Sequence, residues 1–524
     1  MIGAGINGAG IARDASMRGL RVLLLDKGDV GGGTSSWSTR LIHGGLRYLE
    51  HGEIGLVRES LRERECLMNI APHLVRPLPI LVPIYKNARR GSWTMRAGMF
   101  AYDVLSFDKT LPRHRMLSQA ETLRSVPGLN PAGLLGAAVY YDAQVEFAER
   151  LVVENALSAI AHGAEVATYA RVDKLIVEDQ MARSVEFTEE LTGATGTAES
   201  SVIINAAGPW IDQLLEKAGA SSPRLIGGTK GSHIIVGPFA GAPASALYVE
   251  AETDRRPFFI IPWNGNYLIG TTDIRYDGDL DHVRIEEQEI NYLLLETNRV
   301  IPEAYLTHEQ ILYAYSGVRP LPFRGDKDEQ SITRRHFIRR HPRVNNLFSI
   351  VGGKLTTYRS LAQKTVDVLF KQLGRRPPKS TTAQELLPGA NTADLATFAE
   401  HFKQECGLTE STSNRLLRIY GTRSAVLLNL LREDPALTEV FDFETGAIAA
   451  EVVLASKYEL AQTLSDCLLR RTMVGLNSTC GLNALEAAAA IAQKHFGWSS
   501  ARTGEEVVEY KKYVKQFRAN DPVQ

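Results

Sequence analysis

The sequence predicts an α/β protein with a Rossmann-like dinucleotide-binding domain, a second domain built on an antiparallel sheet, and a C-terminal all-α domain. Three observations predict this fold class. A G-x-G-x-x-G stretch begins at the third residue. Strand patterns and a hairpin signal lie in the middle of the chain. From about residue 385 onward the sequence is helical, with apolar faces and no motif that carries chemistry by itself.

Composition excludes several classes of function. The chain has 524 residues, 23% of them charged, and a formal net charge of −1, which gives no reason to expect a nucleic-acid partner. Its four cysteines are scattered and lack metal-ligand spacing, so we expect reduced thiols, no metal and a cytoplasmic location. No apolar run reaches about 18 residues, and no secretory signal is recognisable, so no membrane-spanning helix is expected.

The glycine stretch has the context of a dinucleotide site. A helix pattern follows Gly3, Gly5 and Gly8, and the next strand pattern, residues 21–26, ends in Asp26. The helix N-terminus would face the pyrophosphate, and Asp26 would bind a ribose hydroxyl. The alternative is a glycine-rich turn without a ligand. Only two residues precede Gly3, which predicts a short first strand and a weakened domain, as a truncation or a misassigned start codon would produce.

The loop after that strand favours a flavin dinucleotide. Residues 33–48 are rich in serine, threonine and glycine, and small hydroxyl side chains suit the extended ribityl–pyrophosphate chain of FAD. A nicotinamide-dependent enzyme would normally continue into another helix and strand at this point. Beside the glycine motif, this loop therefore favours FAD.

Five sequence blocks resemble one family. The stretch TSSWSTRLIHGGLRYLEHGE (residues 34–53) is similar to the corresponding part of the FAD-dependent glycerol-3-phosphate dehydrogenases of the respiratory, aerobic type. Four later blocks resemble the same family in its order and spacing: NAAGPW (205–210), KGSH (230–233), YSGVRPL (315–321) and GGKLTTYR (352–359). One departure is Arg40, where lysine is common in the family. The resemblance covers essentially the whole chain.

The resemblance implies an FAD-binding domain of the glutathione-reductase and D-amino-acid-oxidase type. Between the pieces of that domain, a hairpin is expected around residues 263–266, in an antiparallel sheet that forms the substrate domain as a roof over the flavin. The expected division is a discontinuous FAD-binding domain (1–78, 139–212 and 345–375), a substrate domain (79–138 and 213–344) and a helical domain (385–524). Cofactor contacts are expected from Gly3, Gly5, Gly8, Asp26, Thr34, Ser35, Ser36, Ser38, His43, Gly44, Gly45, Gly208, Gly353, Lys354, Leu355 and Thr356.

The implied reaction is oxidation of sn-glycerol 3-phosphate to dihydroxyacetone phosphate by hydride transfer to flavin N5. By resemblance, Arg47 and Arg319 hold the phosphate and Tyr48 lines the pocket. Arg334 and Lys354 lie near the reacting oxygens, and Lys354 with the helix after Gly353 also stabilises negative charge on the reduced flavin. The alternative for each of these cations is that it is a solvent-exposed surface charge with no role in the site.

A base must also take the hydroxyl proton. His233 is the first candidate, because imidazole accepts a proton near neutral pH, and its alternative is a hydrogen-bonded core histidine. His43 is the second candidate, although its position suggests flavin packing. Thr272 is expected on the substrate side in preference to Asp273, which is expected to cap the turn.

The family's respiratory members pass electrons to quinone, so ubiquinone or menaquinone is the implied acceptor and part of the protein must touch the cytoplasmic membrane. Residues 85–102 combine four basic residues with tryptophan, methionine, phenylalanine and tyrosine, which is typical of a short amphipathic helix in the lipid interface. The alternative is a helix packed inside the substrate domain. The basic cluster 334–340 could add charge there, but Arg334 cannot serve both places.

Three other functions stay open. A glycerophosphate oxidase would use O₂ instead of quinone, although no long insertion of the oxidase sort is visible. An amine or amino-acid oxidase also needs arginine, but several cations around one pocket favour a dianionic phosphate. An inactive flavin-binding scaffold is the non-enzymatic alternative. The sequence leaves a homodimer open.

Overall fold

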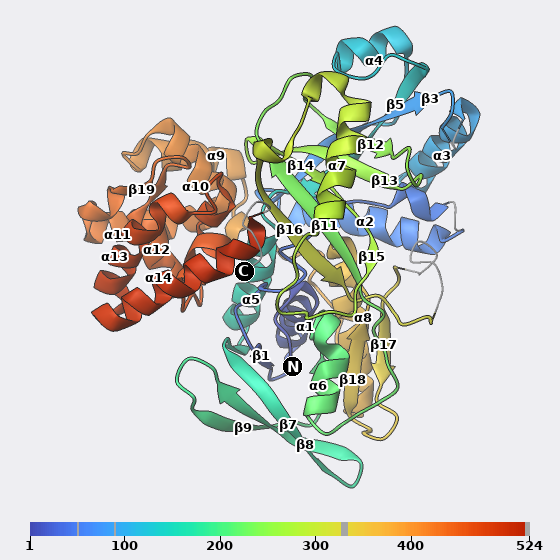
Figure 1. Cartoon of the computed structure of the whole chain (residues 1–524). Helices are drawn as coiled ribbons and strands as arrows, with labels where there is room; N and C mark the ends of the chain where they lie inside the picture. Colours follow the sequence, from blue (N-terminus) through green and yellow to red (C-terminus); the bar gives the residue numbers. More distant parts are fainter. Residues whose placement is uncertain (50–51, 89–90, 326–333, 519–524) are drawn as a thin grey trace.

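The computed structural model describes residues 1–49, 52–88, 91–325 and 334–518. Figure 1 shows two sheets stacked along the molecule, with the C-terminal helices in orange and red on one side. This arrangement of α/β parts and a helical C-terminal region confirms the predicted fold class. The division into domains at particular residues remains a prediction.

The smaller, mostly parallel sheet carries the glycine motif. Its strands are β1 (Leu23–Leu25), β6 (Glu165–Ala167), β10 (Ile203–Asn205), β18 (Leu347–Val351) and β17 (Phe337–Arg340). Ile2 forms parallel bridges to Leu25 and to Asn205, so it joins the β6–β1 pair to the β10–β18–β17 group. The first strand is short, as predicted, yet it pairs on both sides: the amide of Ile2 donates to the carbonyl of Ile204 at 2.9 Å.

Helices and a small meander cover the two faces of this sheet. The helices are α1 (Ile6–Met17), α5 (Ala148–Ala161) and α8 (Tyr358–Gln372), and the other face carries α6 (Ile211–Lys217) with the meander β7 (Ala170–Glu178), β8 (Met181–Glu189) and β9 (Thr195–Glu199). Small residues of α1 allow close packing: a Cβ on Gly10 would lie 2.6 Å from the Tyr358 ring. The turn before α1 is thereby fixed against the sheet.

The second sheet has ten strands in the order β15-β11-β14-β13-β12-β3-β5-β2, with β16 beside β11 and β4 beside β5. They are β2 (Leu41–Ile42), β3 (Val75–Tyr85), β4 (Arg115–Ser118), β5 (Leu134–Val145), β11 (Thr229–Val236), β12 (Ala246–Glu250), β13 (Pro257–Trp263), β14 (Asn266–Gly270), β15 (Ile274–Arg275) and β16 (Ile311–Arg319). β13 and β14 form the predicted hairpin. The long β3–β5 pair runs through positions 78 and 139, where the expected domain boundary falls.

Strand alternation in this sheet separates a core face from a site face. On β11, Ile234 and Val236 belong to the buried cluster that α7 (Glu287–Val300) covers. His233 alternates with Ile234 and so faces the opposite side, toward the smaller sheet. The remaining helices of this half are α2 (Ile54–Ile70), α3 (Ser92–Leu105) and α4 (Gln119–Ser125).

The C-terminal region is mainly helical. It contains α9 (Leu395–Glu405), α10 (Glu410–Tyr420), α11 (Ser424–Glu433), α12 (Ala449–Tyr458), α13 (Leu485–Phe496) and α14 (Ser500–Val514), with two short strands, β19 (Val440–Asp442) and β20 (Ala447–Ile448). The sequence predicts a helix over residues 445–459, but α12 begins only at Ala449. The Thr445 hydroxyl donates to Asp442 at 2.5 Å, and this turn closes the β19–β20 hairpin instead.

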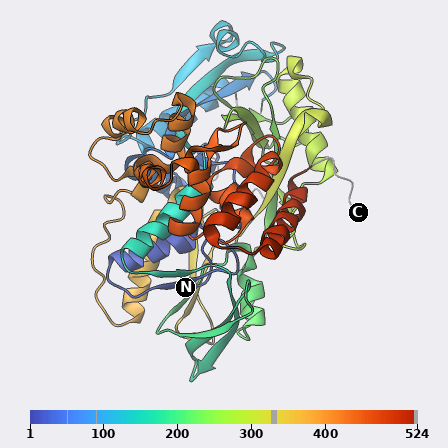
Figure 2. The same cartoon turned by 90° about the vertical axis from the view of Figure 1, so that its left-hand side faces the viewer.

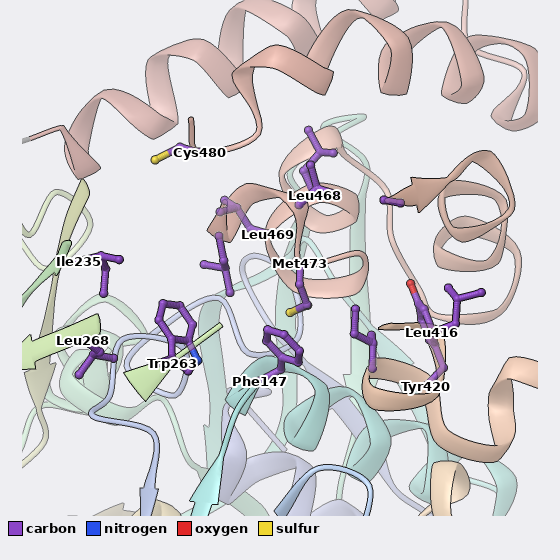
Figure 3. Close-up of a cluster of buried hydrophobic side chains, with 14 of the residues drawn as sticks. Phe147, Ile235, Trp263, Leu268, Leu416, Tyr420, Leu468, Leu469, Met473 and Cys480 are labelled. Carbon is purple, nitrogen blue, oxygen red and sulfur yellow. The ribbon is translucent and has the colours of Figure 1, made fainter. Parts of the chain in front are cut away.

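A shared core joins the helical region to the rest. Figure 2 shows the orange and red helices facing the viewer, between the large sheet and the β7–β9 meander. Figure 3 shows side chains from both parts in one cluster, among them Phe147, Ile235, Trp263, Leu268, Leu416, Leu468 and Met473. Buried ion pairs add to it: Arg150 contacts Glu459 at 2.5 Å, and Arg471 contacts Asp29 at 2.7 Å. The helical region is therefore fastened to the glycine-motif half.

Candidate active site

A cavity of about 1160 Å³ lies between the two sheets. Of the residues predicted to form the site, its wall includes Gly3, Gly5, Asp26, Thr34, Ser35, Ser38, His43, Gly45, Tyr48, Gly208, His233, Arg319, Arg334, Gly353, Lys354, Leu355 and Thr356. The fold thus gathers into one place blocks that are hundreds of residues apart in sequence.

The glycine turn has no room for side chains. Gly3 has a positive φ of 102°, and a Cβ there would lie 2.6 Å from the carbonyl oxygen of Ala206. A Cβ on Gly8 would collide with the carbonyl of Gly3, so Gly8 serves the close approach of α1 and lies off the cavity wall. The N-terminus of α1 opens beside Gly5 and Ser35, where the positive end of the helix dipole favours a phosphate.

Asp26 pins this turn at the end of β1. Its Oδ2 accepts the Ala4 amide at 2.5 Å and its Oδ1 accepts the Gly28 amide at 2.9 Å. Burial raises the pKa of Asp26 above its usual value, although the two backbone N–H groups oppose that shift. A carboxylate at the end of this strand, on the cavity wall, fits a ribose hydroxyl.

The hydroxyl-rich loop closes one side of the cavity. Thr34 Oγ1 donates to the Val318 carbonyl at 2.7 Å, which ties the loop to β16. Ser35 Oγ accepts the Ile6 amide at 3.0 Å, at the start of α1. Ser36 differs from expectation: it is buried off the wall, and its hydroxyl donates to the Gly31 carbonyl at 2.6 Å. Ser36 therefore shapes the loop.

Arg40 is a structural residue of the same loop. Both of its terminal nitrogens lie 2.7 Å from the carboxylate oxygens of Glu149, and its guanidinium stacks over Trp263. It is fully buried. A lysine cannot make this bidentate contact. The arginine therefore does more here than keep the positive charge of the lysine that is common in the family.

The segments around residues 43–45 and 352–356 meet at the cavity. The His43 amide donates to Thr356 Oγ1 at 3.1 Å. Gly44 lies off the wall, because its amide donates to the Tyr102 hydroxyl at 3.0 Å. Asn7 was not singled out from the sequence. Its side-chain amide donates to the Gly352 carbonyl at 3.3 Å, and its buried Oδ1 has no hydrogen-bond donor within the described chain.

His233 lies on the cavity wall, on β11 of the large sheet, between β14 and β16. Its Nε2 is 2.9 Å from Thr39 Oγ1, and its ring packs against Tyr315 at 4.9 Å between centroids. Burial, with Arg319 and Arg40 nearby, lowers the pKa of His233 well below its usual value. The imidazole is therefore neutral at physiological pH, as a proton acceptor must be.

Two arginines share one carboxylate beside this histidine. Asp273 lies 3.0 Å from Nη1 of Arg319 and 3.0 Å from Nη2 of Arg334. Burial opposes ionisation, but the two guanidinium charges lower the pKa of Asp273 below its usual value. Gly231 makes room for this cluster, because a Cβ there would collide with the Arg319 guanidinium. The result is a preorganised cationic wall with one neutralising carboxylate.

The position of Thr272 differs from the expected one. Its hydroxyl is turned away from the cavity and donates to Glu289 of α7 at 2.6 Å. Its neighbours Thr271 and Asp273 are on the wall, and Thr271 Oγ1 accepts a hydrogen bond from Arg319 Nη2 at 3.0 Å. Residues in this extended turn alternate sides, so Asp273 has the site position and does not merely cap the turn.

Lys354 projects toward α2. Its Nζ donates to Ser60 Oγ at 2.9 Å and lies 4.3 Å from the centre of the Tyr48 ring. Burial lowers the pKa of Lys354 below its usual value. The backbone of Arg47 lies in the short turn Leu46–Leu49, but its side chain falls outside the described part of the structure.

The helical region supplies wall residues that sequence reasoning missed. Ser465, Arg470, Tyr513 and Phe517 line the cavity, and the Phe517 ring lies 4.9 Å from Trp37 of the hydroxyl-rich loop. No local sequence pattern predicts that these residues line the cavity. Across the described ranges, no group of His, Cys, Asp and Glu side chains could hold a metal ion.

Comparisons with known proteins give the same picture. The profile of a family described as "FAD dependent oxidoreductase" matches residues 1–360. The profile described as "C-terminal domain of alpha-glycerophosphate oxidase" matches residues 380–503. A glycerol-3-phosphate dehydrogenase of Synechocystis is 46% identical over 98% of this chain and 96% of its own length. A D-erythritol 1-phosphate dehydrogenase of Brucella abortus is 38% identical over 91% and 94%.

A solved structure also matches along the whole chain. It is the glycerol-3-phosphate dehydrogenase of Bacillus halodurans complexed with FAD. It superposes with a TM-score of 0.79 at 28% identity, covering 100% of this chain and 95% of that one. The glycine cradle, Asp26 and the cavity of about 1160 Å³ fit the dinucleotide that this relative holds.

Proposed function

The chain belongs to the FAD-dependent glycerol-3-phosphate dehydrogenases of the FAD dependent oxidoreductase family, and on this premise we propose that it oxidises sn-glycerol 3-phosphate to dihydroxyacetone phosphate and passes the electrons to a membrane quinone. The observation that carries the proposal is the Arg319–Asp273–Arg334 cluster on the same wall as a neutral, buried His233. We assign the cluster as the phosphate holder and His233 as the base of this one cavity.

Substrate binding rests on the two arginines. A phosphate monoester carries close to two negative charges at neutral pH, and guanidinium groups match its oxygens. Asp273 holds both guanidiniums and offsets one of their two positive charges, which leaves a net charge of +1 facing the dianion. Arg47 is proposed as a further phosphate contact and Tyr48 as a lining residue, on the family resemblance.

Proton removal is assigned to His233. Its ring nitrogen accepts the hydroxyl proton of the alcohol while the carbon loses hydride, and the Thr39 hydroxyl orients the ring. FAD, when bound, supplies the hydride acceptor. Lys354 and the backbone N–H groups that follow it would stabilise negative charge near the cofactor's pyrimidine end. The low pKa of His233 keeps it ready as a base.

The electron acceptor is proposed from a second set of residues. Tyr48, Tyr140, Tyr248 and Phe259 give the cavity an aromatic side. Tyr140 packs edge-on against Tyr102 of α3, with centroids 5.6 Å apart. This side therefore runs toward α3, and aromatic walls suit a quinone ring.

Helix α3 has two apolar faces. Met95, Met99 and Tyr102 point into the core, so the inward packing that the sequence left open is present. Trp93, Phe100 and Val104 are exposed on the helix, Trp93 to 84%, and Phe107, which follows the end of the helix, is exposed to 78%. We assign this outer face to the lipid interface. The segment differs from the predicted span, since β3 ends at Tyr85 and residues 89–90 lie outside the described part. No described helix is long and apolar enough to cross a bilayer.

The acceptor is tested by turnover with two oxidants. Purified protein loaded with FAD is given sn-glycerol 3-phosphate and either a soluble ubiquinone analogue or O₂, and hydrogen peroxide is measured. Rapid quinone reduction with little peroxide supports the proposal. Stoichiometric peroxide and no response to quinone would support the oxidase, which the match to the glycerophosphate oxidase C-terminal profile keeps as the second candidate. D-erythritol 1-phosphate, the named substrate of one relative, is the comparison substrate.

A further inference from the structure

A second cavity, of about 940 Å³, lies between the helical region and the sheet half of the molecule. The start of β3 and the β13–β14 turn, residues 264–266, form one wall. Helices α9 and α10 form the other. This cleft shares no lining residue with the active-site cavity.

The charge of the cleft is mainly positive. Arg76 and Arg418 lie on opposite walls and Lys403 lies on α9. Burial lowers the pKa of Arg76; the nearby Glu146 carboxylate opposes that shift, and Arg418 adds to it, so the two cations are close enough to repel each other across one carboxylate. The lining carboxylate Glu444 is already engaged, because it accepts the amide and the hydroxyl of Ser478 at 2.8 and 2.6 Å.

Two buried nitrogens on the wall make no hydrogen bond among the described residues. His73 is only 2% exposed; its Nε2 contacts Glu154 at 2.8 Å, but its buried Nδ1 has no hydrogen-bond partner among the described residues. The buried Nε of Arg418 likewise makes no hydrogen bond there, and its nearest carboxylate oxygen, on Glu146, is 3.4 Å away. Buried polar atoms are normally satisfied. Because Nε2 of His73 faces a carboxylate and donates to it, Nδ1 of the singly protonated ring is an acceptor, so only Nε of Arg418 is a donor that an oxygen of a bound anion can satisfy.

The floor of the cleft is apolar. Phe147 and Met473 line it and belong to the shared core, where Figure 3 shows both side chains. Leu417 and Ile419 of α10 continue this surface. A ligand that fits must therefore have an apolar or aromatic body as well as anionic oxygens.

We propose that this cleft binds a phosphorylated organic anion of mononucleotide size, with its phosphates among Arg76, Lys403 and Arg418 and its body against Phe147 and Met473. The cleft is a second site and does not depend on the reaction assigned to the first cavity.

Glu146 connects the cleft to the hydroxyl-rich loop. Its carboxylate faces Arg418, while its backbone carbonyl accepts hydrogen bonds from Arg40 at 3.3 Å and from the Trp263 indole at 2.7 Å. Arg40 in turn holds the Ser36 carbonyl at 3.1 Å. An anion in the cleft would draw Arg418 away from Glu146. Glu146 contacts Arg40, and Arg40 contacts the hydroxyl-rich loop. Occupancy of the cleft is therefore expected to change the rate of flavin reduction.

The test is calorimetric titration of FAD-loaded protein with adenosine 5′-diphosphate, with inorganic pyrophosphate as the probe that lacks an apolar body. The wild type and Arg319→Ala, which weakens the other anion site, should bind the nucleotide equally. Arg76→Gln with Lys403→Gln should bind it about tenfold more weakly or worse, since each lost partner is a charge-assisted contact. Lys457→Gln, an exposed cation on α12, is the matched control.

The outcomes separate cleanly. Two results together support the site. Pyrophosphate binds more weakly than the nucleotide, and nucleotide binding is lost only in the variant with Arg76→Gln and Lys403→Gln. Binding lost in Arg319→Ala and kept in the cleft variant would place the anion in the first cavity and overturn the proposal. The proposal would also be overturned if the wild type released or absorbed no heat with millimolar nucleotide. Unchanged melting temperatures of the variants would show that lost binding is not lost folding.

Discussion

Arg319 Nη1 lies 3.0 Å from Oδ1 of Asp273, so the cation that faces the cavity is already held in place by a carboxylate. The same carboxylate holds Arg334 at 3.0 Å through its other oxygen. Such preorganisation spares the substrate the cost of ordering two long side chains. It also means that the carboxylate matters as much as the cations.

Replacing Arg319 should weaken substrate binding. We expect Arg319→Ala to raise KM about 10- to 100-fold, because charge-assisted hydrogen bonds contribute about 1.5–3 kcal/mol. Bound FAD should be unaffected, since Arg319 contacts Asp273 and Thr271 rather than the glycine turn. Steady-state kinetics and the flavin content measure both effects. An unchanged KM would remove Arg319 from the phosphate site.

Replacing Asp273 tests the preorganisation itself. Asp273→Asn keeps the shape but removes the charge that orients both arginines, so KM should rise about tenfold. Thr272→Val is the matched comparison, because the Thr272 hydroxyl is turned toward Glu289. If Thr272→Val has the larger effect on KM, the substrate approaches from the other side of this turn.

The pH dependence follows from His233. Its pKa is lowered well below the usual value, so the neutral base persists as the pH falls through 6.5, the usual pKa. Activity that needs this base is therefore lost only at lower pH, near the depressed pKa. Flavin reduction followed by stopped flow at saturating substrate should stay flat from pH 7 to below 6.5, and His233→Ala should be slow throughout. Normal reduction in His233→Ala would exclude it as the base.

A buried ion pair fastens the helical region to α5. Glu459 contacts Arg150 at 2.5 Å, and although burial opposes ionisation, Arg150 and neighbouring arginines lower the pKa of Glu459 from 4.5 to about 2. Glu459→Gln leaves Arg150 buried without its counter-charge, which should cost about 3–5 kcal/mol at pH 7. Because the folded pKa is depressed, this contribution is present above pH 4.5 and is lost as the pH falls toward 2.

Urea unfolding of wild type and Glu459→Gln at pH 7 and pH 3 measures the difference. The difference in the free energy of unfolding between the two proteins should be smaller at pH 3 than at pH 7. Glu405→Gln, which removes a partner of Arg432 in an exposed pair, is the control and should change little. A gap that is the same at both pH values would contradict the ionised pair.

The outer face of α3, together with Phe107 just after the end of the helix, gives a membrane prediction. Trp93→Ser with Phe107→Ser should reduce binding to anionic lipid vesicles about tenfold or more, because burying a large apolar side chain is worth about 1.5–3 kcal/mol. Phe443→Ser, which alters a 90% exposed aromatic in the helical region, is the control. Flavin reduction by soluble substrate should be unchanged in both. Equal vesicle binding by all three proteins would place the lipid contact elsewhere.

Sequence patterns predicted most of the dinucleotide half, because its rules are local. Positions 3 and 8 require glycine because other backbone segments pack too close to leave room for a Cβ atom, and Asp26 follows the strand that comes after their helix. Those constraints lie within one βαβ unit. Hence the turn, the strand and the helix all appear where the pattern indicates.

The rest depends on long-range contacts that no local pattern carries. Thr272 turns away because Glu289 of α7 captures its hydroxyl, and Asp273 gains its role from Arg334, far along the chain. Phe517 reaches Trp37 only because the helical region packs against the cavity. Which side of a turn faces a site, and which distant helix closes it, are decided by packing.

Oxidation of sn-glycerol 3-phosphate by the bound flavin can be followed in an anaerobic visible spectrum of the FAD-loaded protein before and after the substrate is added. We expect the flavin absorbance to bleach without any other reductant. A flavin band that persists with sn-glycerol 3-phosphate, yet bleaches with dithionite, would contradict the proposed substrate and the role of the Arg319–Asp273–Arg334 cluster.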